Sequence, residues 1–257
     1  MKKVNTSYWK LQSCFSPLLG LIAIVITGCT SSQSDSSPAV LLFNGTGTSA
    51  NDVRAIESLL KAKHLGYSLV NSSRLNAMSE SQLAGYRLIV IPGGNFIEMG
   101  NGLTHDATLR LHKAIDAGLN YLGICAGAFI AGDGHTYYNS LRLTSGAQFG
   151  FYSAENSGMR KAAVAVSRVN APTLELYWED GPNLAGWGDV VGKYPDGTAA
   201  IVEGFMGKGW IILSGVHPEA PETWRHGMTF KTLATEDNEY AGELIDSALN
   251  RTALPHF

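Results

Sequence analysis

A cysteine between two glycines is the side chain in this sequence best placed for nucleophilic chemistry. Gly123 lies near the end of an apolar run over residues 119–124. Cys125 and Gly127 follow this run, among small residues typical of a helix start. Glycines at this spacing let a strand turn sharply into a helix, which lifts the side chain between them clear of the backbone. The free N–H groups and the dipole of that helix favour a thiolate. The pattern therefore predicts a nucleophile, Cys125, at a strand-to-helix turn with strained backbone.

A histidine and a glutamate that could serve this cysteine follow a second apolar run, residues 210–213. Residues two apart in extended chain point to the same side, so Glu219 can bond one nitrogen of His217 while the other faces Cys125. Pro218 stiffens this segment and removes a competing N–H donor. These groups are the nucleophile, base and orienting carboxylate of a catalytic triad. The alternatives are that Cys125 is a buried structural thiol, and that His217 only ends a strand beside a solvated Glu219.

Further residues of the site are expected close to these three. Pro92, Gly93 and Gly94 end an expected strand over residues 87–91, and the glycines' lack of side chains would let a substrate approach the backbone. We expect the N–H groups of Gly94 and Ala126 to form an oxyanion hole, with Gly93 beside the substrate. A plain tight turn is the alternative. Trp178 and Glu179 are expected to line the substrate cleft, unless they form an exposed hairpin end.

Apolar runs that alternate with helical patterns predict the fold class. Such alternation is typical of an α/β fold, in which helices cover both faces of a mostly parallel sheet and ligands bind at the carboxyl ends of the strands. Between residues 132 and 200 the pattern loosens, and we expect inserted β structure with a hairpin over the active face. A helix that begins near residue 235 should complete the domain. The expected strands span residues 39–43, 67–70, 87–91, 119–124, 199–205 and 209–213.

A positively charged start and a short apolar stretch mark the first residues as a targeting segment. The apolar stretch, residues 18–26, is shorter than the about 20 residues that a membrane-spanning helix needs, so export with cleavage is expected. Residues 26–29, Ile-Thr-Gly-Cys, resemble the bacterial lipoprotein cleavage signal, in which the cysteine becomes the lipidated first residue. Cys29 is therefore the expected lipidation site, and an ordinary secretory signal is the alternative.

This processing predicts three parts of the chain: a signal peptide over 1–28, a flexible tether over 29–38, and one folded domain over 39–257. We expect a protein that is anchored by lipid in the bacterial cell envelope, on the periplasmic side. Thr30 after the lipidated cysteine resembles the signal for retention in the outer membrane. Cleavage removes Cys14 and lipidation uses Cys29, which leaves Cys125 as the free thiol.

Composition and charge exclude some function classes. With 45% hydrophobic and 16% charged residues, the chain has the composition of an ordinary globular domain. Loss of the three lysines before residue 29 lowers the formal net charge from −3 to about −6, which argues against a nucleic-acid partner. The loop from Gly45 to Gly47 lacks the third glycine of a dinucleotide fingerprint, and the other histidines lack paired ligand spacing. We therefore expect no cofactor and no metal.

The motifs resemble those of the class I glutamine amidotransferase-like superfamily. The strings at residues 91–94, 121–129 and 213–219 are more similar to one branch, the domain at the N-terminus of some biotin–protein ligases, which also occurs alone. This resemblance implies a flavodoxin-like three-layer fold with a Cys125–His217–Glu219 triad. No ligase domain follows these motifs in the sequence, so we do not expect biotin transfer.

One departure from the superfamily bears on the substrate. Members that hydrolyse glutamine usually carry a glutamine four residues after the nucleophile, and this chain has Phe129 there. A related branch of glyoxalase-like and protease-like proteins has histidine directly after the cysteine, where this chain has Ala126. We therefore predict a cysteine hydrolase that acts on an amide other than glutamine, in a small molecule or a peptide. The alternative is an envelope lipoprotein that binds a ligand without turnover. The sequence indicates no particular protein partner.

Overall fold

The computed structural model describes residues 38–134, 136–152 and 160–257. The expected signal peptide, the lipidation site Cys29 and the tether up to residue 37 lie outside these ranges. Within them, every helix is too short or too polar to cross a membrane.

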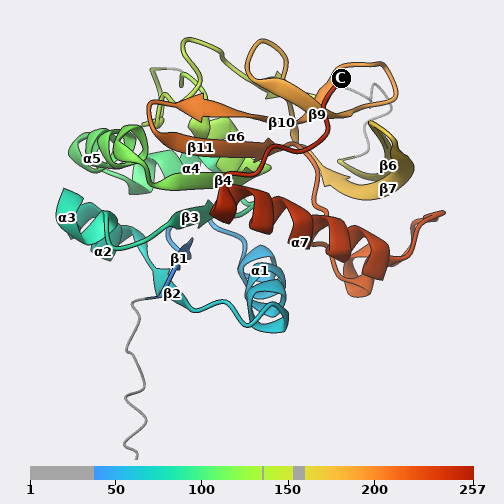
Figure 1. Ribbon diagram of the computed structural model, residues 1–257, viewed down its shortest axis with the longest axis horizontal. Helices are drawn as coiled ribbons and strands as arrows, with labels where there is room; N and C mark the ends of the chain where they lie inside the picture. Colours follow the sequence, from blue (N-terminus) through green and yellow to red (C-terminus); the bar gives the residue numbers. More distant parts are fainter. Residues whose placement is uncertain (1–37, 135, 153–159) are drawn as a thin grey trace, which may run out of the picture. The chain divides into compact units, whose positions relative to one another are not determined.

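The fold is built on a nine-stranded sheet (Figure 1). Its first five strands in spatial order pair in parallel, and the remaining four extend the sheet by antiparallel pairing. The order of the parallel part is that of flavodoxin-like sheets. In spatial order the strands are β2 (Tyr67–Val70), β1 (Val40–Phe43), β3 (Leu88–Ile91), β4 (Asn120–Ile124), β11 (Gly209–Ser214), β10 (Ala199–Met206), β9 (Asp189–Lys193), β6 (Lys161–Arg168) and β7 (Ala171–Glu179).

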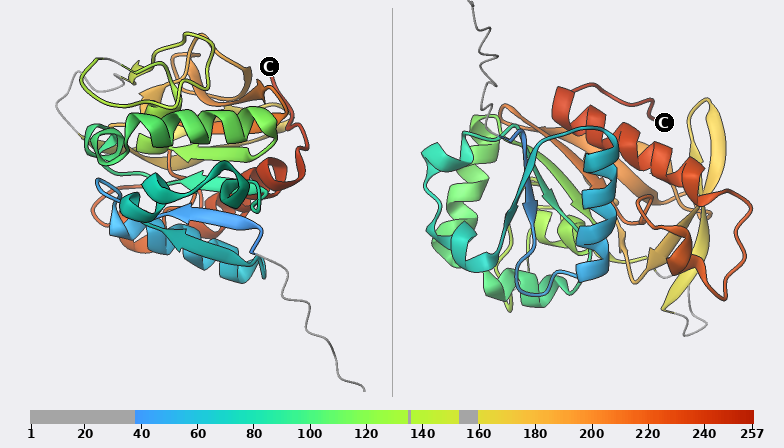
Figure 2. Two further views of the ribbon diagram at one scale, coloured as in Figure 1. Left: turned by 90° about the vertical axis from the view of Figure 1, so that its left-hand side faces the viewer. Right: turned by 90° about the horizontal axis from the view of Figure 1, so that it is seen from below.

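Helices cover both faces of the sheet, as the alternating pattern predicts (Figure 1 and Figure 2). Successive residues of β1 point to opposite faces, so that Leu41 and Phe43 join one apolar cluster while Val40 and Leu42 join the other. The first cluster packs against α2 to α6, and the second against α1 and α7. The helices are α1 (Ala50–Ala62), α2 (Ser72–Ala77), α3 (Glu80–Leu83), α4 (Phe96–Gly102), α5 (His105–Ala117), α6 (Ala126–Ala131), α7 (Ala234–Asn250) and the 3-10 helix η1 (Glu222–Arg225).

The loosely patterned middle of the chain forms β structure, as expected, and the end of its hairpin reaches the cavity through Glu179. Strands β6 and β7 form an antiparallel hairpin that continues the central sheet, because β6 pairs with β9 through Ser167 and Arg168. A separate two-stranded sheet joins β5 (Gly150–Phe151) to β8 (Pro182–Asn183). The three-layer α/β fold with a hairpin region is therefore confirmed, and the hairpin is an extension of the sheet itself.

The turn between β4 and α6 depends on a very close approach of two backbones. A Cβ atom added at Gly127 would lie 2.0 Å from the carbonyl oxygen of Ile91, the last residue of β3. Real Cβ atoms do not tolerate that distance, so α6 can begin against β3 only with glycine at this position. Gly123 serves the same turn, because a Cβ atom there would lie 2.7 Å from the Gly127 oxygen.

Replacement of Gly127 by alanine should lower the free energy of unfolding by about 1–3 kcal/mol, the usual cost of overpacking. The matched control is Gly150→Ala, because a Cβ atom there meets no atom within 4 Å. Urea unfolding followed by circular dichroism measures both variants. Equal stability of the two variants would contradict the close approach of α6 to β3.

Candidate active site

The carboxyl ends of three neighbouring parallel strands bring the predicted catalytic residues together. Gly94 follows β3, Cys125 follows β4, and His217 follows β11, and these strands are adjacent in the sheet. The backbone N–H of Cys125 donates a hydrogen bond of 2.7 Å to the oxygen of Ser214 at the end of β11. Parallel pairing thus places residues far apart in the sequence at one edge of the sheet.

Cys125 has the strained backbone that the sequence predicts. It stands between β4 and α6 with φ 50° and ψ −105°, a conformation that residues with a side chain seldom adopt. The residue is 6% exposed. The sulfur donates a hydrogen bond of 3.6 Å to the oxygen of Glu179, at the end of β7. The turn therefore presents the sulfur to a confined space at the sheet edge.

His217 is held from both its backbone and its ring. Its N–H donates a hydrogen bond of 2.8 Å to the oxygen of Tyr177 in β7. The Nδ1 atom of the ring lies 2.9 Å from Oε1 of Glu219 in a hydrogen bond, as the two-residue spacing predicts. The rings of Tyr177 and Trp224 contact the imidazole edge to face. Because Nδ1 is engaged with a carboxylate, Nε2 is the nitrogen free for chemistry.

A second carboxylate, which the sequence analysis missed, faces the same nitrogen. Oδ1 of Asp52 lies 3.2 Å from Nδ1 of His217, and the Asp52 side chain is 8% exposed. Asp52 is in the first turn of α1, three residues after Ser49, whose side chain caps the helix. An acid at this position is common in helices because it favours the dipole. The signal that could have identified Asp52 is its place just beyond β1, at the same edge of the sheet.

Burial and neighbouring charges shift the pKa values of Asp52, His217 and Glu219 in opposite directions. Burial by itself would lower the pKa of His217, but the charges of Glu219 and Cys125 and contact with Asp52 raise that pKa well above its ordinary value. Burial raises the pKa of Glu219. Burial also acts to raise the pKa of Asp52, but the interaction with His217 outweighs it and the pKa is lowered. The site therefore favours a protonated imidazole between carboxylates, and its members titrate together.

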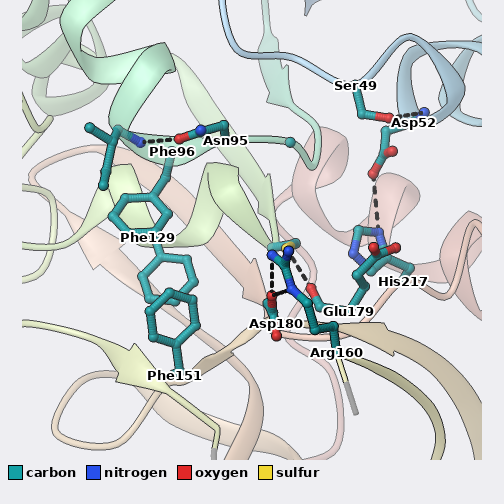
Figure 3. Close-up of a pocket in the computed structure, with 13 residues that line it drawn as sticks. Ser49, Asp52, Asn95, Phe96, Phe129, Phe151, Arg160, Glu179, Asp180 and His217 are labelled. Carbon is teal, nitrogen blue, oxygen red and sulfur yellow. Dashed lines mark hydrogen bonds and ion pairs between the residues drawn. The ribbon is translucent and has the colours of Figure 1, made fainter. Parts of the chain in front are cut away.

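A cavity of about 430 Å³ opens at these residues (Figure 3). Gly94, Cys125, Phe129, Glu179 and His217 line it, as do residues that the sequence analysis did not select. The latter are Ser49, Asp52, Asn95, Phe96, Ile97, Phe151, Arg160 and Asp180. Arg160 and Asp180 form an ion pair, with Nη2 and Oδ2 at 2.6 Å.

Two expected substrate-binding residues do not line this cavity. Trp178 is 2% exposed, contacts Tyr152 edge to face, and donates from its ring N–H to the Gly181 oxygen at 3.3 Å. It faces the core because neighbours in a strand point to opposite sides, and Glu179 takes the cavity side. Gly93 makes room for the charged group: a Cβ atom there would lie 2.2 Å from Oδ1 of Asp52 and 2.7 Å from Cε1 of His217.

The two proposed oxyanion donors have different positions. Gly94 lines the cavity and has a φ of 144°. Hydrogen bonds hold the residues on either side of it: the N–H of Ser49 donates to the Gly93 oxygen, and the N–H of Asn95 donates to the Gly47 oxygen. Ala126 is fully buried as the first residue of α6. Its N–H has no carbonyl partner within the helix, as for any first helical residue. Their joint action as an oxyanion hole stays a prediction.

Asp52, His217 and Glu219 also have the side-chain types of a metal site, and one ligand atom of each lies within 4.8 Å of the others. Here, however, both carboxylates approach the same ring nitrogen, at 2.9 Å and 3.2 Å. These distances fit a proton on Nδ1, whereas a metal ion would take its own place at about 2.0–2.2 Å from each ligand. The expectation of no metal stays a prediction.

Comparisons with known proteins agree with the motifs. Residues 38–160 match the protein family described as Biotin-protein ligase, N terminal. This range includes Cys125 and ends before His217. The chain is 27% identical over 212 residues to a biotin–protein ligase of Schizosaccharomyces pombe, in an alignment that covers 70% of this chain and 33% of the ligase. The chain thus spans about a third of the length of this curated relative.

Solved structures define the fold. A glutamine amidotransferase structure superposes with a TM-score of 0.54 at 18% identity and covers 70% of this chain and 90% of its own. An exo-β-1,4-mannosidase from Opitutaceae bacterium strain TAV5 has a TM-score of 0.52 at 13% identity, over 82% of this chain and 36% of its own. The described residues therefore have a class I glutamine amidotransferase-like fold. Within this fold, residues 38–160 are similar in sequence to the N-terminal region of biotin–protein ligases.

Replacement of Asp52 by asparagine should lower the pKa of His217, because one of its two neighbouring negative charges is lost. The pKa of His217 is raised in the folded state and that of Asp52 is lowered. The stabilisation from their pairing is therefore complete above the ordinary Asp value of 3.8 and below the ordinary His value of 6.5. It disappears as the pH rises through the raised pKa of His217.

Between these two pH values, Asp52→Asn should cost about 2 kcal/mol of unfolding free energy, and the cost should shrink in alkali. Urea unfolding across pH measures the cost, and NMR of the ring nitrogens follows the protonation of His217. Asp246→Asn is the control, because Asp246 pairs with Lys63 on the surface. An unchanged titration of His217 would contradict the role assigned to Asp52.

Proposed function

We propose that this site belongs to a cysteine hydrolase that cleaves an amide bond other than that of glutamine, in a small molecule or a peptide. The observation that supports this most strongly is a buried imidazole, fixed through Nδ1 by Glu219 and Asp52, in one cavity with the sulfur of Cys125. A fixed Nδ1 leaves Nε2 to exchange a proton with the sulfur and with the leaving group. A binding protein has no need of this arrangement.

The reaction follows from these positions. The Cys125 thiolate attacks the amide carbon, a C–S bond forms, and the carbonyl oxygen takes the negative charge near the N–H groups of Gly94 and Ala126. The imidazolium of His217 gives its proton to the departing amine as the C–N bond breaks. Water then loses a proton to His217 and attacks the thioester, which releases a carboxylic acid and restores the thiolate. Glu219 and Asp52 stabilise the imidazolium throughout.

Phe129 supports an acyl group other than that of glutamine. Its side chain lines the cavity beside Cys125 and offers no hydrogen-bond partner to a carboxamide or to an amino-acid headgroup. A second candidate function, ligand binding without turnover, is favoured by one observation. The sulfur of Cys125 donates a hydrogen bond to the Glu179 oxygen, an arrangement that holds a neutral thiol. The two functions therefore differ in the protonation state of Cys125.

Reactivity of the cysteine distinguishes these functions. As a thiolate, Cys125 should react with iodoacetamide at neutral pH about ten times faster or more than a free thiol whose pKa is near 8.5. His217→Ala should remove most of this excess, and the control His105→Ala, at an exposed position outside the cavity, should keep it. Mass spectrometry of the labelled protein gives the rates. A rate no higher than that of a free thiol would favour the binding function.

We also propose that the protein is a lipid-anchored component of the bacterial envelope, with Cys29 as the first residue of the mature chain. The support for this is the sequence pattern of residues 18–29. Mass spectrometry of the mature N-terminus should find a diacylglycerol-modified Cys29, and Cys29→Ser should abolish this modification. An unmodified start at another residue would contradict lipid anchoring.

A further inference from the structure

Three phenylalanine rings from separate elements form one wall of the cavity. Phe96 begins α4, Phe129 lies in α6, and Phe151 ends β5. Phe96 stacks on Phe129 with ring centroids 4.4 Å apart, and Phe151 meets Phe129 edge to face at 5.0 Å. We call this set the phenylalanine wall. Phe129 is 3% exposed and Phe151 is 56% exposed, so Phe151 supplies open aromatic surface on the wall.

The phenylalanine wall lies on the opposite side of the cavity from Asp52 and His217. Figure 3 shows Phe96, Phe129 and Phe151 in a column on one side, and Asp52 and His217 on the other. In the proposed reaction the departing amine must face His217, because the imidazolium protonates it. The carbonyl oxygen must face Gly94. The remaining substituent of the amide carbon is the acyl group, and it is directed away from His217, toward the wall.

The chemistry of the wall selects the kind of acyl group. The carbon atoms of its three rings offer no hydrogen-bond donor or acceptor. Arg160 and Asp180, which line the same cavity, already pair with each other through Nε and Nη2 of the arginine. Stacked and edge-to-face contacts are the arrangements that aromatic rings prefer. A flat aromatic group would extend the column that Phe96, Phe129 and Phe151 already form.

We infer that the substrate carries an aromatic ring on the acyl side of the bond that Cys125 attacks. This inference rests on the proposed function, because it uses the positions of the nucleophile and the base to orient the substrate. It assigns the phenylalanine wall as the acyl-binding site and the substrate class as arylalkanoyl amides.

Binding of unreactive amides to the full chain with Cys125→Ala tests the inference without any need for turnover. Isothermal titration should give 3-phenylpropionamide an affinity at least about tenfold above that of propionamide, the discrimination usual for an apolar pocket. It should also bind more tightly than 3-cyclohexylpropionamide, because a saturated ring cannot stack. Equal affinities for the phenyl and cyclohexyl amides, or no binding of the phenyl amide, would overturn the inference.

Variants of the wall locate the binding. In the Cys125→Ala background, Phe151→Ala and Phe129→Gln should each remove most of the preference for the phenyl amide. Phe205→Ala is the control, because Phe205 is 63% exposed, packs on Trp210 and lies outside the cavity. A preference that survives both wall variants would place the aromatic group elsewhere and overturn the inference. A failure of the proposed function appears instead in the iodoacetamide rates of the unmodified chain, which this titration does not use.

Discussion

A protonated imidazole between two buried carboxylates is the interaction on which this site depends. A charge in the protein interior is costly unless it is paired. Loss of His217 would therefore leave two buried carboxylates without their partner, and loss of Asp52 or Glu219 would leave His217 with one neighbouring carboxylate instead of two. The backbone around these three side chains is arranged to hold them together. Gly93 leaves the space that the group occupies, and the Tyr177 oxygen fixes the backbone of His217. The end of the sheet is thus constrained by charge as well as by apolar packing.

The two parts of the central sheet supply different components of the site. The parallel strands β3, β4 and β11 place the backbone of Gly94, the sulfur of Cys125 and the ring of His217 at one edge. The antiparallel extension contributes β7, whose last residues reach the same edge and provide the Glu179 oxygen that contacts the sulfur. The parallel part alone would leave the cavity open on the side that Glu179 and Asp180 cover.

The fold does not by itself decide the chemistry, since a glutamine amidotransferase and part of a mannosidase share it. The residues that line the cavity bear on the chemistry more directly than the fold does. An apolar wall replaces the polar group that the resemblance would place at Phe129, and a second carboxylate accompanies the base. Both features bear on the proposed reaction, in which the wall would bind the acyl side of the substrate and the second carboxylate would favour protonation of His217.

The sequence by itself determined the α/β class, the turn that carries Cys125, and the pairing of His217 with Glu219. These features depend on periodicity and short spacings, which act over a few residues. The tertiary structure decided which residues meet from distant segments. Asp52 has the sequence of an ordinary helix start. It meets His217 only because the fold brings the first turn of α1 and the segment after β11 to the same edge of the sheet. Phe96, Phe129 and Phe151 form a wall because three separate elements converge. Trp178 faces the core because the pairing of β7 in the sheet sets which of its alternating side chains is buried.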